Sequence, residues 1–225
     1  MKNALILSSA ALMMVGCASL SSYQDARTLE QGKASFFVGA GNFSQTYKEQ
    51  DTDIENDIND ALEDWTMPLI EAGVRLGVYE NLDFGLKYTL PGGINVDGKY
   101  QLVGGQEGMF GAASGLKFGY LNYKVNEAEY TTMDFTVPVY LTVYPTTWAA
   151  LTVTPDFTFR TETATEGETE TASIYGANTS LKLGTKYGVV AEYGIHMSDD
   201  ESIDAYQQVG LMFYSPLELG LESLF

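Results

Sequence analysis

The sequence of 225 residues is poor in cysteine, histidine and basic residues: it has one cysteine, one histidine and 12 Lys+Arg against 30 Asp+Glu. One cysteine cannot form an internal disulfide, and CxxC-type zinc or redox sites are excluded. The net charge of -18 argues against a nucleic-acid partner, because phosphate binding needs a basic face. Hydrophobic residues make up 45% of the chain and charged residues 19%, so it is neither disordered nor collagen-like. The length suits one domain.

Long apolar runs are also absent after the first twenty residues, where no stretch approaches the ~18 apolar residues that a membrane helix needs. Near the start, Lys2 precedes an apolar run from Ala4 to Val15 that is broken only by Ser8 and Ser9. This run is too short to span a bilayer as a helix and is typical of a secretory signal peptide. We therefore expect residues 1–16 to lie outside the folded domain.

The single cysteine stands directly after this run. Met14-Val15-Gly16-Cys17-Ala18-Ser19 resembles the bacterial lipobox, in which small residues precede a cysteine that is lipidated and becomes the new N-terminus. The resemblance implies an acyl chain such as palmitate on Cys17 and a lipid anchor with a linker over residues 17–33. Because no Asp follows the cysteine, it also implies lipoprotein sorting to the outer membrane of a Gram-negative bacterium. The alternative is an ordinary cleavage site beside a small apolar residue.

Alternation of apolar and polar residues, punctuated by turns, recurs through the rest of the chain and predicts β-strands. Between Pro68 and Tyr79, for example, every second residue is apolar. Ten strands are predicted, at about 34–47, 67–79, 82–90, 94–103, 110–124, 130–144, 148–161, 172–184, 187–197 and 204–214. Most exceed the 5–6 residues typical of soluble sheets and match the ~9–11 residues that a tilted strand needs to cross a bilayer.

Prolines and glycines set the register of these strands. At Pro91-Gly92-Gly93, a three-residue loop pairs Leu90 with Ile94 and keeps both on one face, whereas a two-residue Gly-Gly loop would place apolar residues opposite charged ones. Parity therefore favours the longer loop. Pro138 and Pro155 lie inside predicted strands, which weakens the assignment of those two strands.

The connections between the strands are long on one side and short on the other. One side carries residues 48–66, 91–93, 125–129, 162–171 and 198–203; the other carries residues 80–81, 104–109, 145–147 and 185–186, the C-terminal tail and the lipidated N-terminus. Outer-membrane barrels have long external loops and tight periplasmic turns. A single strand over 82–103 would move loop 162–171 to the short side and dissolve this asymmetry. Ten strands is therefore the favoured count, with eight as the alternative.

Most of the excess acidity falls in the long loops. Residues 48–66, 125–129, 161–171 and 198–204 hold eight, two, four and four acids, which is 18 of the 30, together with one base, Lys48. The remaining 12 acids nearly match the remaining 11 bases. The acidity thus marks one pole of the molecule, which we expect to be extracellular.

The two faces of the strands have opposite chemistry. In a membrane barrel apolar residues face lipid and polar residues face the lumen, the inverse of a soluble sandwich. The polar face is rich in glycine and in charges of both signs, as a narrow lumen requires. The predicted lumen charges are Glu71, Arg75, Asp83, Lys87, Asp97, Lys99, Lys117, Lys182 and Glu192, and the predicted lipid-facing residues are Val74, Leu76, Phe84, Leu86, Val139, Leu141, Leu151 and Val153. Aromatic residues near strand ends suggest an interfacial girdle: Tyr79, Tyr88, Tyr120, Tyr144, Trp148 and Tyr187.

A resemblance supports this assignment. Residues 81–93, NLDFGLKYTLPGG, with Lys99-Tyr100-Gln101-Leu102, look like the hairpins of small bacterial outer-membrane β-barrels of the porin-like type. The pattern covers about residues 34–214 and implies an all-β, up-and-down antiparallel transmembrane β-barrel over residues 34–225. In that family a C-terminal aromatic residue is read by the barrel-assembly machinery. Either Phe213 or the final Phe225 could close the last strand here.

Few residues suggest chemistry. His196-Met197-Ser198 resembles the His-x-Ser of outer-membrane lipid A deacylases, but strand alternation turns His196 to the lumen, near Glu192 or a loop carboxylate. The acids Asp199, Asp200, Glu201 and Asp204 resemble the barrel-mouth acids of outer-membrane proteases, but those proteases are larger and a run of acids is more often a solvated loop. Residues 51–65 have apolar residues at helical spacing, which suggests a short amphipathic helix over the mouth, and their Asp-x-Asp pattern lacks the glycine of a calcium loop.

The sequence therefore predicts a lipid-anchored, non-enzymatic outer-membrane barrel with a structural or narrow-pore role and a plugged, salt-bridged interior. A surface binding or adhesion module, whose acidic loops engage cations, lipopolysaccharide or another cell, is the alternative, and a lipid A-modifying enzyme is the lesser one. The expected partners are outer-membrane lipid, lipopolysaccharide and the assembly and sorting machinery. No cofactor or metal is expected, and association into a homo-oligomer is left open.

Overall fold

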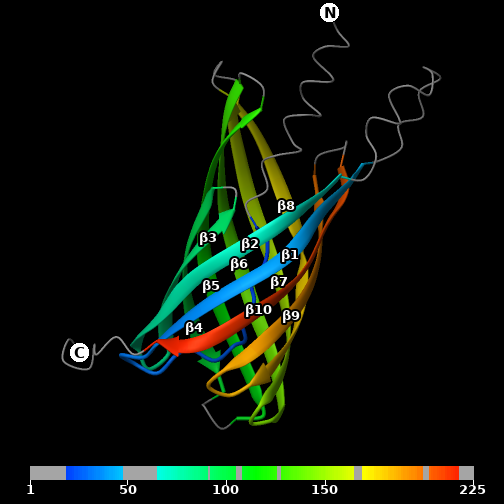
Figure 1. Cartoon of the computed structure of the whole chain (residues 1–225). Coiled ribbons are helices and arrows are strands. Elements are labelled where there is room, and N and C mark those ends of the chain that lie inside the picture. The colour runs from blue at the N-terminus through cyan, green and yellow to red at the C-terminus, as the bar shows by residue number, and fades with distance from the viewer. Residues whose placement is uncertain are drawn as a thin grey trace, which may run out of the picture.

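A computed structural model describes residues 19–47, 65–90, 92–104, 108–125, 128–164, 169–199 and 203–217. The strands are β1 (Ala34–Tyr47), β2 (Trp65–Tyr79), β3 (Leu82–Leu90), β4 (Gly93–Val103), β5 (Phe110–Val125), β6 (Ala128–Thr146), β7 (Ala149–Ala164), β8 (Thr169–Gly184), β9 (Gly188–Ser198) and β10 (Ile203–Leu217). Each pairs antiparallel with its neighbours, and β1 closes the ring against β10 (Figure 1). The predicted ten-stranded up-and-down barrel is confirmed.

The seam between β1 and β10 is continuous, with pairs running from Ala34↔Leu217 to Tyr47↔Ile203 and one irregularity near Tyr47. Closure leaves no unpaired edge among the ten described strands, which is the condition for a sheet to sit in lipid, where no water can satisfy backbone groups. The last strand continues past Phe213 to Leu217, so Phe213 does not end it. Phe225 lies outside the described residues.

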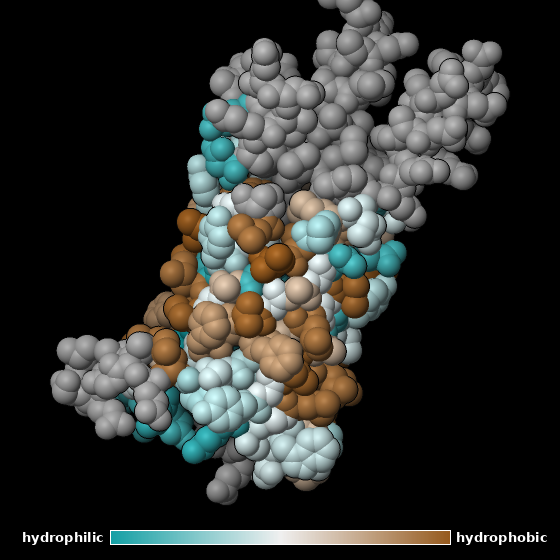
Figure 2. All heavy atoms as spheres, in the orientation of Figure 1, coloured by the Kyte–Doolittle hydropathy of each residue, from teal (hydrophilic) through white to brown (hydrophobic). Residues whose placement is uncertain are grey.

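The burial of the strands is inverted relative to a soluble protein. Along β3 the buried positions include Asp83 and Lys87, whereas Phe84 and Leu86 on the other face are 47% and 49% exposed. On the face seen in Figure 2, hydrophobic residues form a belt across the middle of the barrel wall, with hydrophilic residues toward its ends. Of the predicted lipid-facing residues, six are exposed (Val74, Phe84, Leu86, Leu141, Leu151 and Val153) and two are half-buried (Leu76 and Val139). An apolar belt of this kind is stable only in contact with lipid.

Exposed aromatic side chains lie near both ends of the belt. Tyr88 and Tyr120 flank Ile94 near the long-loop end, and Tyr79, Trp148 and Tyr187 lie at the short-turn end. Tyr144 is different, because it is only 6% exposed and faces the lumen. The prediction that Tyr144 belongs to the outer girdle is wrong: its neighbours along the strand occupy the outer face, so alternation turns Tyr144 inward.

The hairpin between β3 and β4 keeps the predicted parity but shifts by one residue. Thr89 pairs with Gly93 and Tyr88 with Ile94, so the three-residue loop is 90–92 rather than 91–93, and Ile94 does not pair with Leu90. Gly92 has a φ of +151° and donates its N–H to the carbonyl of Thr89 at 2.8 Å. A side chain would be strained at this φ, which fixes the turn at glycine.

The prolines in the strands are tolerated by gaps in the pairing. On the β5 side, Ser114 pairs with Val139, and pairing resumes only at Lys117↔Thr136. Pro138 has no N–H to donate, and its carbonyl accepts a hydrogen bond from the Ser114 hydroxyl at 3.2 Å instead. Both prolines therefore remain within continuous strands.

Several expectations concern residues outside the described ranges. They are the signal peptide, Cys17, most of the acids of the long loops, and the amphipathic helix at 51–65 except for its last residue, Trp65, which begins β2 instead. No helix among the described residues is long and apolar enough to span a membrane.

We predict that a charge on the outer face destabilises the barrel according to its depth. Leu86, at the centre of β3, should lose about 2–4 kcal/mol of unfolding free energy on Leu86→Arg, because the guanidinium would replace an apolar side chain in the hydrocarbon. The matched change Leu102→Arg, one residue from the short-turn end of β4, should lose about 0–1 kcal/mol. Denaturant unfolding in lipid vesicles measures both. Equal losses would contradict a membrane belt centred on Leu86.

Candidate functional site in the barrel lumen

Residues 19–33, expected as a linker beside the short turns, run into the barrel: residues 19–29 lie inside it, and residues 30–33 join them to β1 at the short-turn end. We call residues 19–33 the lumen segment. Seven of its fifteen residues are at most 6% exposed: Ser19, Leu20, Ser21, Tyr23, Asp25, Ala26 and Thr28. The expectation that this stretch lies beside the short turns as a linker is therefore wrong for residues 19–29. The hydrogen bonds that involve a side chain and join the segment to the wall connect residues 50 to 189 apart in sequence, so no local pattern predicts them.

The segment enters the lumen at the short-turn end. Gly32 donates its N–H to the carbonyl of Gly77 at 2.9 Å, and Gly77 donates to the carbonyl of Lys33 at 2.9 Å. A Cβ on Gly77 would lie 2.1 Å from the carbonyl oxygen of Glu30, so a side chain at this position would collide with the segment. Glycine on the lumen face of β2 thus makes room for the chain to turn inward from β1.

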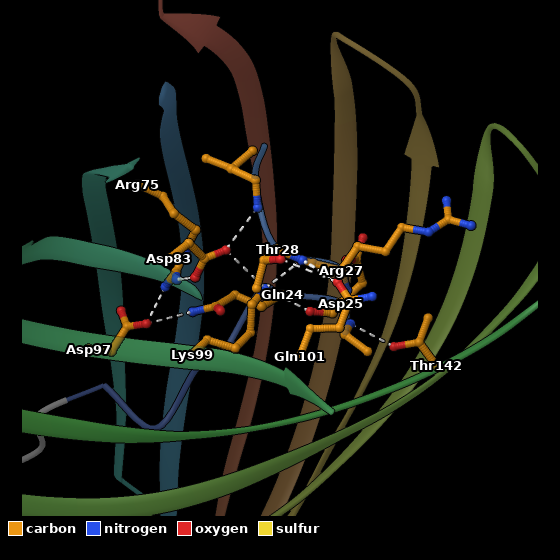
Figure 3. Close-up of polar contacts among 12 residues, drawn as sticks. Gln24, Asp25, Arg27, Thr28, Arg75, Asp83, Asp97, Lys99, Gln101 and Thr142 are labelled. Atoms are coloured by element: carbon orange, nitrogen blue, oxygen red, sulfur yellow. Dashed lines mark hydrogen bonds and ion pairs between the residues drawn. The ribbon is translucent and has the colours of Figure 1, made fainter. Parts of the chain in front are cut away.

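In the short-turn half of the lumen, wall side chains form hydrogen bonds with the backbone of the segment (Figure 3). The carbonyls of Asp25 and Arg27 accept hydrogen bonds from the Lys99 ammonium at 2.9 and 2.7 Å. The N–H of Thr28 donates to the Gln101 amide oxygen at 3.0 Å, and that of Leu29 to Asp83 Oδ2 at 3.1 Å. These wall groups replace the strand or helix partners that the segment lacks.

Two side chains of the segment also bind the wall. Asp25 accepts a hydrogen bond from Lys182 at 2.7 Å, an ion pair in which Asp25 is 6% exposed. The guanidinium of Arg27 lies 3.6 Å from the ring centroid of Tyr144, while the Arg27 N–H donates to the Tyr144 hydroxyl at 3.0 Å. The segment therefore carries one anion and one cation that each meet a matching group.

In the middle of the lumen, Glu192 of β9 captures three donors from the segment. Its carboxylate accepts the N–H of Ser22 at 2.8 Å, the Ser22 hydroxyl at 2.7 Å and the N–H of Tyr23 at 2.6 Å. Tyr23 adopts a φ of +45°, rare for a residue with a side chain, and its ring packs against Val190. A Cβ on Gly210 would lie 1.7 Å from the Tyr23 hydroxyl, so Gly210 leaves the space that this ring fills.

Toward the long-loop end, the segment meets polar and then apolar wall. Lys87 donates to the Ser21 hydroxyl at 2.6 Å and pairs with Glu71 at 2.9 Å, and Glu71 accepts from the same hydroxyl. Lys117 donates to the carbonyl of Ser19 at 3.1 Å. The side chain of Leu20 joins a buried apolar cluster with Phe43, Leu69, Ile174 and Tyr206.

The nine predicted lumen charges all contact one another or the segment. Arg75 of β2 binds both Asp83 of β3 and Asp97 of β4 (Figure 3), and Lys99 adds a 3.6 Å contact to Asp83. Glu71, Lys87, Lys117, Lys182 and Glu192 make the contacts given above. The sequence indicated that these side chains share one face, but it gave no sign that a tenth group, Asp25 of the segment, pairs with Lys182.

Sequence reasoning missed a second set of lumen charges on β6 and β7. Arg160 binds Asp134 through two hydrogen bonds of 2.8 Å each, the bidentate geometry that makes such pairs strong. His196, which is fully buried, lies 3.1 Å from Asp156, so its partner is neither Glu192 nor a loop carboxylate. Alternation with the exposed Met133 and Phe135 was the available signal for Asp134.

A cavity of about 1000 Å³ remains beside the segment. It extends from the short-turn end, at Trp148, Tyr187 and Leu217, to Lys117 and Asp156 deeper in the lumen. The charged side chains around it are eight cations (Arg27, Lys33, Arg75, Lys87, Lys99, Lys117, Lys182 and Lys186) and five anions (Asp25, Glu30, Asp83, Asp97 and Asp156). Within the described ranges no three His, Cys, Asp or Glu side chains are grouped so as to hold a metal ion.

An apolar outer belt, closed strands and a charged, filled interior together define a transmembrane β-barrel. No protein-family model matches the sequence, and no curated protein matches it. Among solved structures, similarity extends to Ail, the attachment invasion locus protein of Yersinia pestis, with 9% identity and a TM-score of 0.39 over 82% of this chain and 99% of that one. The β domain of the Bordetella autotransporter BrkA is 12% identical, with a TM-score of 0.41 over 81% of this chain and 99% of that one. The translocator domain of NalP from Neisseria meningitidis is 8% identical, with a TM-score of 0.39 over 94% of each chain. At these values the likeness says nothing about function, which has to come from the residues of this chain.

We predict that the pair Asp134–Arg160 is strongly coupled. Arg160→Leu should lower the unfolding free energy by about 3–5 kcal/mol, because Asp134 would stay buried without its partner. The double change Asp134→Asn/Arg160→Leu should lose clearly less, since no charge is stranded. Denaturant unfolding of the two single variants and the double variant gives the coupling energy. Additive losses would mean that the two side chains do not depend on each other.

Proposed function

We propose that this protein is an outer-membrane β-barrel whose lumen is sealed by its own N-terminal segment. Its role is then structural in the sealed state, and narrow-pore passage requires the segment to leave. The observation that carries the proposal is the set of wall-to-backbone hydrogen bonds along residues 19–29, made by Glu192, Lys99, Gln101 and Asp83.

The size of the barrel supports a sealed lumen. Eight strands leave an interior that side chains alone can fill, and wide aqueous channels need about 16. Ten strands fall between these cases, and the extra space is taken by a segment rather than by larger side chains. Gly77 and Gly210 illustrate this, because each leaves room for a group of the segment.

We propose no catalytic role for His196. A lipid substrate would approach the outer face of β9, where Ile195 and Met197 are exposed, but the imidazole is on the opposite face and fully buried. His196 instead bonds Asp156, which also accepts a hydrogen bond from the Asn178 amide at 3.2 Å. This arrangement supports a non-enzymatic barrel.

The location and partners follow from the same features. A closed barrel with a lipid-facing belt and unequal connections fits the outer membrane of a Gram-negative bacterium, with the acidic long loops outside. The partners we propose are outer-membrane lipid, lipopolysaccharide and the barrel-assembly machinery, together with the lipoprotein-sorting machinery if Cys17 is acylated.

We predict that the sealed barrel does not conduct ions in planar bilayers. A chain refolded from Ser19 onward should give a flat current trace. A shortened chain that begins at Gln31 keeps the contacts of Gly32 and Lys33 with Gly77 but loses the sealing residues, so it should show small unitary steps. Heat-modifiable gel migration first establishes that both chains are folded.

A single substitution provides a graded comparison. Asp25→Lys places a cation beside Lys182 and Lys99, so like-charge repulsion should loosen the segment and give intermittent steps. Steps of equal size and frequency in the unaltered chain would refute the seal. Silence of the folded shortened chain would show that the wall side chains close the lumen themselves.

We also predict that the protein stays with the outer-membrane fraction after carbonate washing. A barrel held by its apolar belt resists the wash and migrates on a gel as a folded band that shifts on heating. A soluble domain tethered by a lipid shows no such heat-dependent shift. A variant with Cys17→Ser should still be retained, because the belt rather than an acyl chain holds it. Release of this folded variant by the wash would contradict a membrane-embedded barrel.

A further inference from the structure

The direction of the lumen segment bears on where the N-terminus of the protein lies. The segment leaves β1 at Ala34 on the short-turn side and runs back through the barrel toward lower residue numbers. Along this path its contacts move from Gly77 to Lys99, then to Glu192, and finally to Lys87 and Phe43. The segment therefore climbs the lumen toward the long-loop end.

The apolar cluster around Leu20 shows how far the segment extends along the barrel axis. Its four wall partners lie three to five residues from the long-loop ends of their strands: Phe43 before Tyr47, Leu69 after Trp65, Ile174 after Thr169 and Tyr206 after Ile203. The same four residues are nine to eleven residues from the short-turn ends. With a rise of about 3.3 Å per residue and a tilt of about 40°, Leu20 lies roughly 25 Å above the short-turn ends.

Covalent geometry limits where the preceding residues can go. Residues 1–18 lie outside the described ranges, but three residues of chain span at most about 11 Å, so Cys17 stays within that distance of Leu20. The short-turn mouth, roughly 25 Å away, is out of reach while the segment is seated. The lumen between Leu20 and the short-turn mouth is also occupied by residues 21–29, and its charged wall would not accept acyl chains.

We propose that the chain is threaded through its own barrel, so that its N-terminal end leaves on the acidic-loop side and any acyl chains on Cys17 enter the outer leaflet. The barrel then holds a lipid anchor at the cell surface and not at the periplasmic face. This placement rests on the proposed outer-membrane location and on acylation of Cys17. The threading itself rests only on residues 19–33.

The test uses the full chain expressed in a Gram-negative host. A Flag epitope inserted after Ala18 should be detected by antibody on intact cells, with an unchanged signal after permeabilisation. The matched control carries the same epitope between Glu80 and Asn81, in the short turn after β2, and should give signal only after permeabilisation. Detection of the first epitope only in permeabilised cells overturns the proposal.

A second measurement avoids an insertion that could disturb folding. The Cβ atom of a side chain at Gly111 would lie 3.1 Å from the Cβ of Ala26, and a disulfide needs about 3.5–4.5 Å, so a shift of a few tenths of an ångström suffices. The variant Ala26→Cys/Gly111→Cys should therefore form an intramolecular disulfide in cells, seen as a reducible gel shift. A folded barrel without this bond would show that the segment is not seated in the lumen.

Lipid attachment is read separately. A clickable palmitate analogue should label the unaltered chain and not Cys17→Ser. Absence of label would remove the acyl anchor but leave the threading to be decided by the epitope and the disulfide. Label together with a surface epitope supports the whole proposal, and label together with an epitope hidden in intact cells refutes it.

Discussion

Neutralisation of the lumen charges is the constraint on which the rest of this barrel depends. The wall places Glu71, Arg75, Asp83, Lys87, Asp97, Lys99 and Glu192 out of contact with bulk water, and a buried charge is costly unless it is paired. Neighbouring strands supply some pairs, as Arg75 does for two carboxylates. The lumen segment supplies other partners. Its Asp25 forms an ion pair with Lys182, and its backbone accepts a hydrogen bond from Lys99 and donates one to Glu192. The segment and the wall therefore form a single polar network. Removing the segment would leave buried charges of the wall without partners.

This network also explains the sizes of the side chains on the lumen face. At Gly77 and Gly210 the wall carries glycine, which leaves space for the segment, and elsewhere long side chains such as Lys87 and Lys99 donate hydrogen bonds to its carbonyls. The remaining cavity lies toward the short-turn end, where the wall is lined more by cations than by anions. The protein as a whole is strongly acidic, so the excess of cations around this cavity is opposite in sign to its net charge.

The strands and their faces could be predicted because alternation is a local signal that a membrane barrel and its sequence share. Leu86 and Lys87 are adjacent and must point in opposite directions, whatever the rest of the chain does. The position of Tyr144 was open to the same reasoning, but its closeness to a strand end suggested a girdle instead. The lumen segment was beyond reach, because Ser22 and Glu192 are 170 residues apart and residues 19–33 have no periodicity. Ion pairs between neighbouring strands, such as Asp134 with Arg160, could not be predicted, because the alternation of side chains does not fix the register of two strands.

The covalent link between the lumen segment and β1 constrains the order of assembly. β1 forms the seam with β10, the last strand to be synthesised, so the ring cannot close until the whole chain is present. Once the ring is closed, a bulky segment with Tyr23 locked beside Gly210 and Arg27 against Tyr144 would have to be drawn through a wall of paired charges. A simpler route is for the open sheet to curl around the segment and for the seam to close last, with the segment acting as the template on which the lumen charges first find their partners.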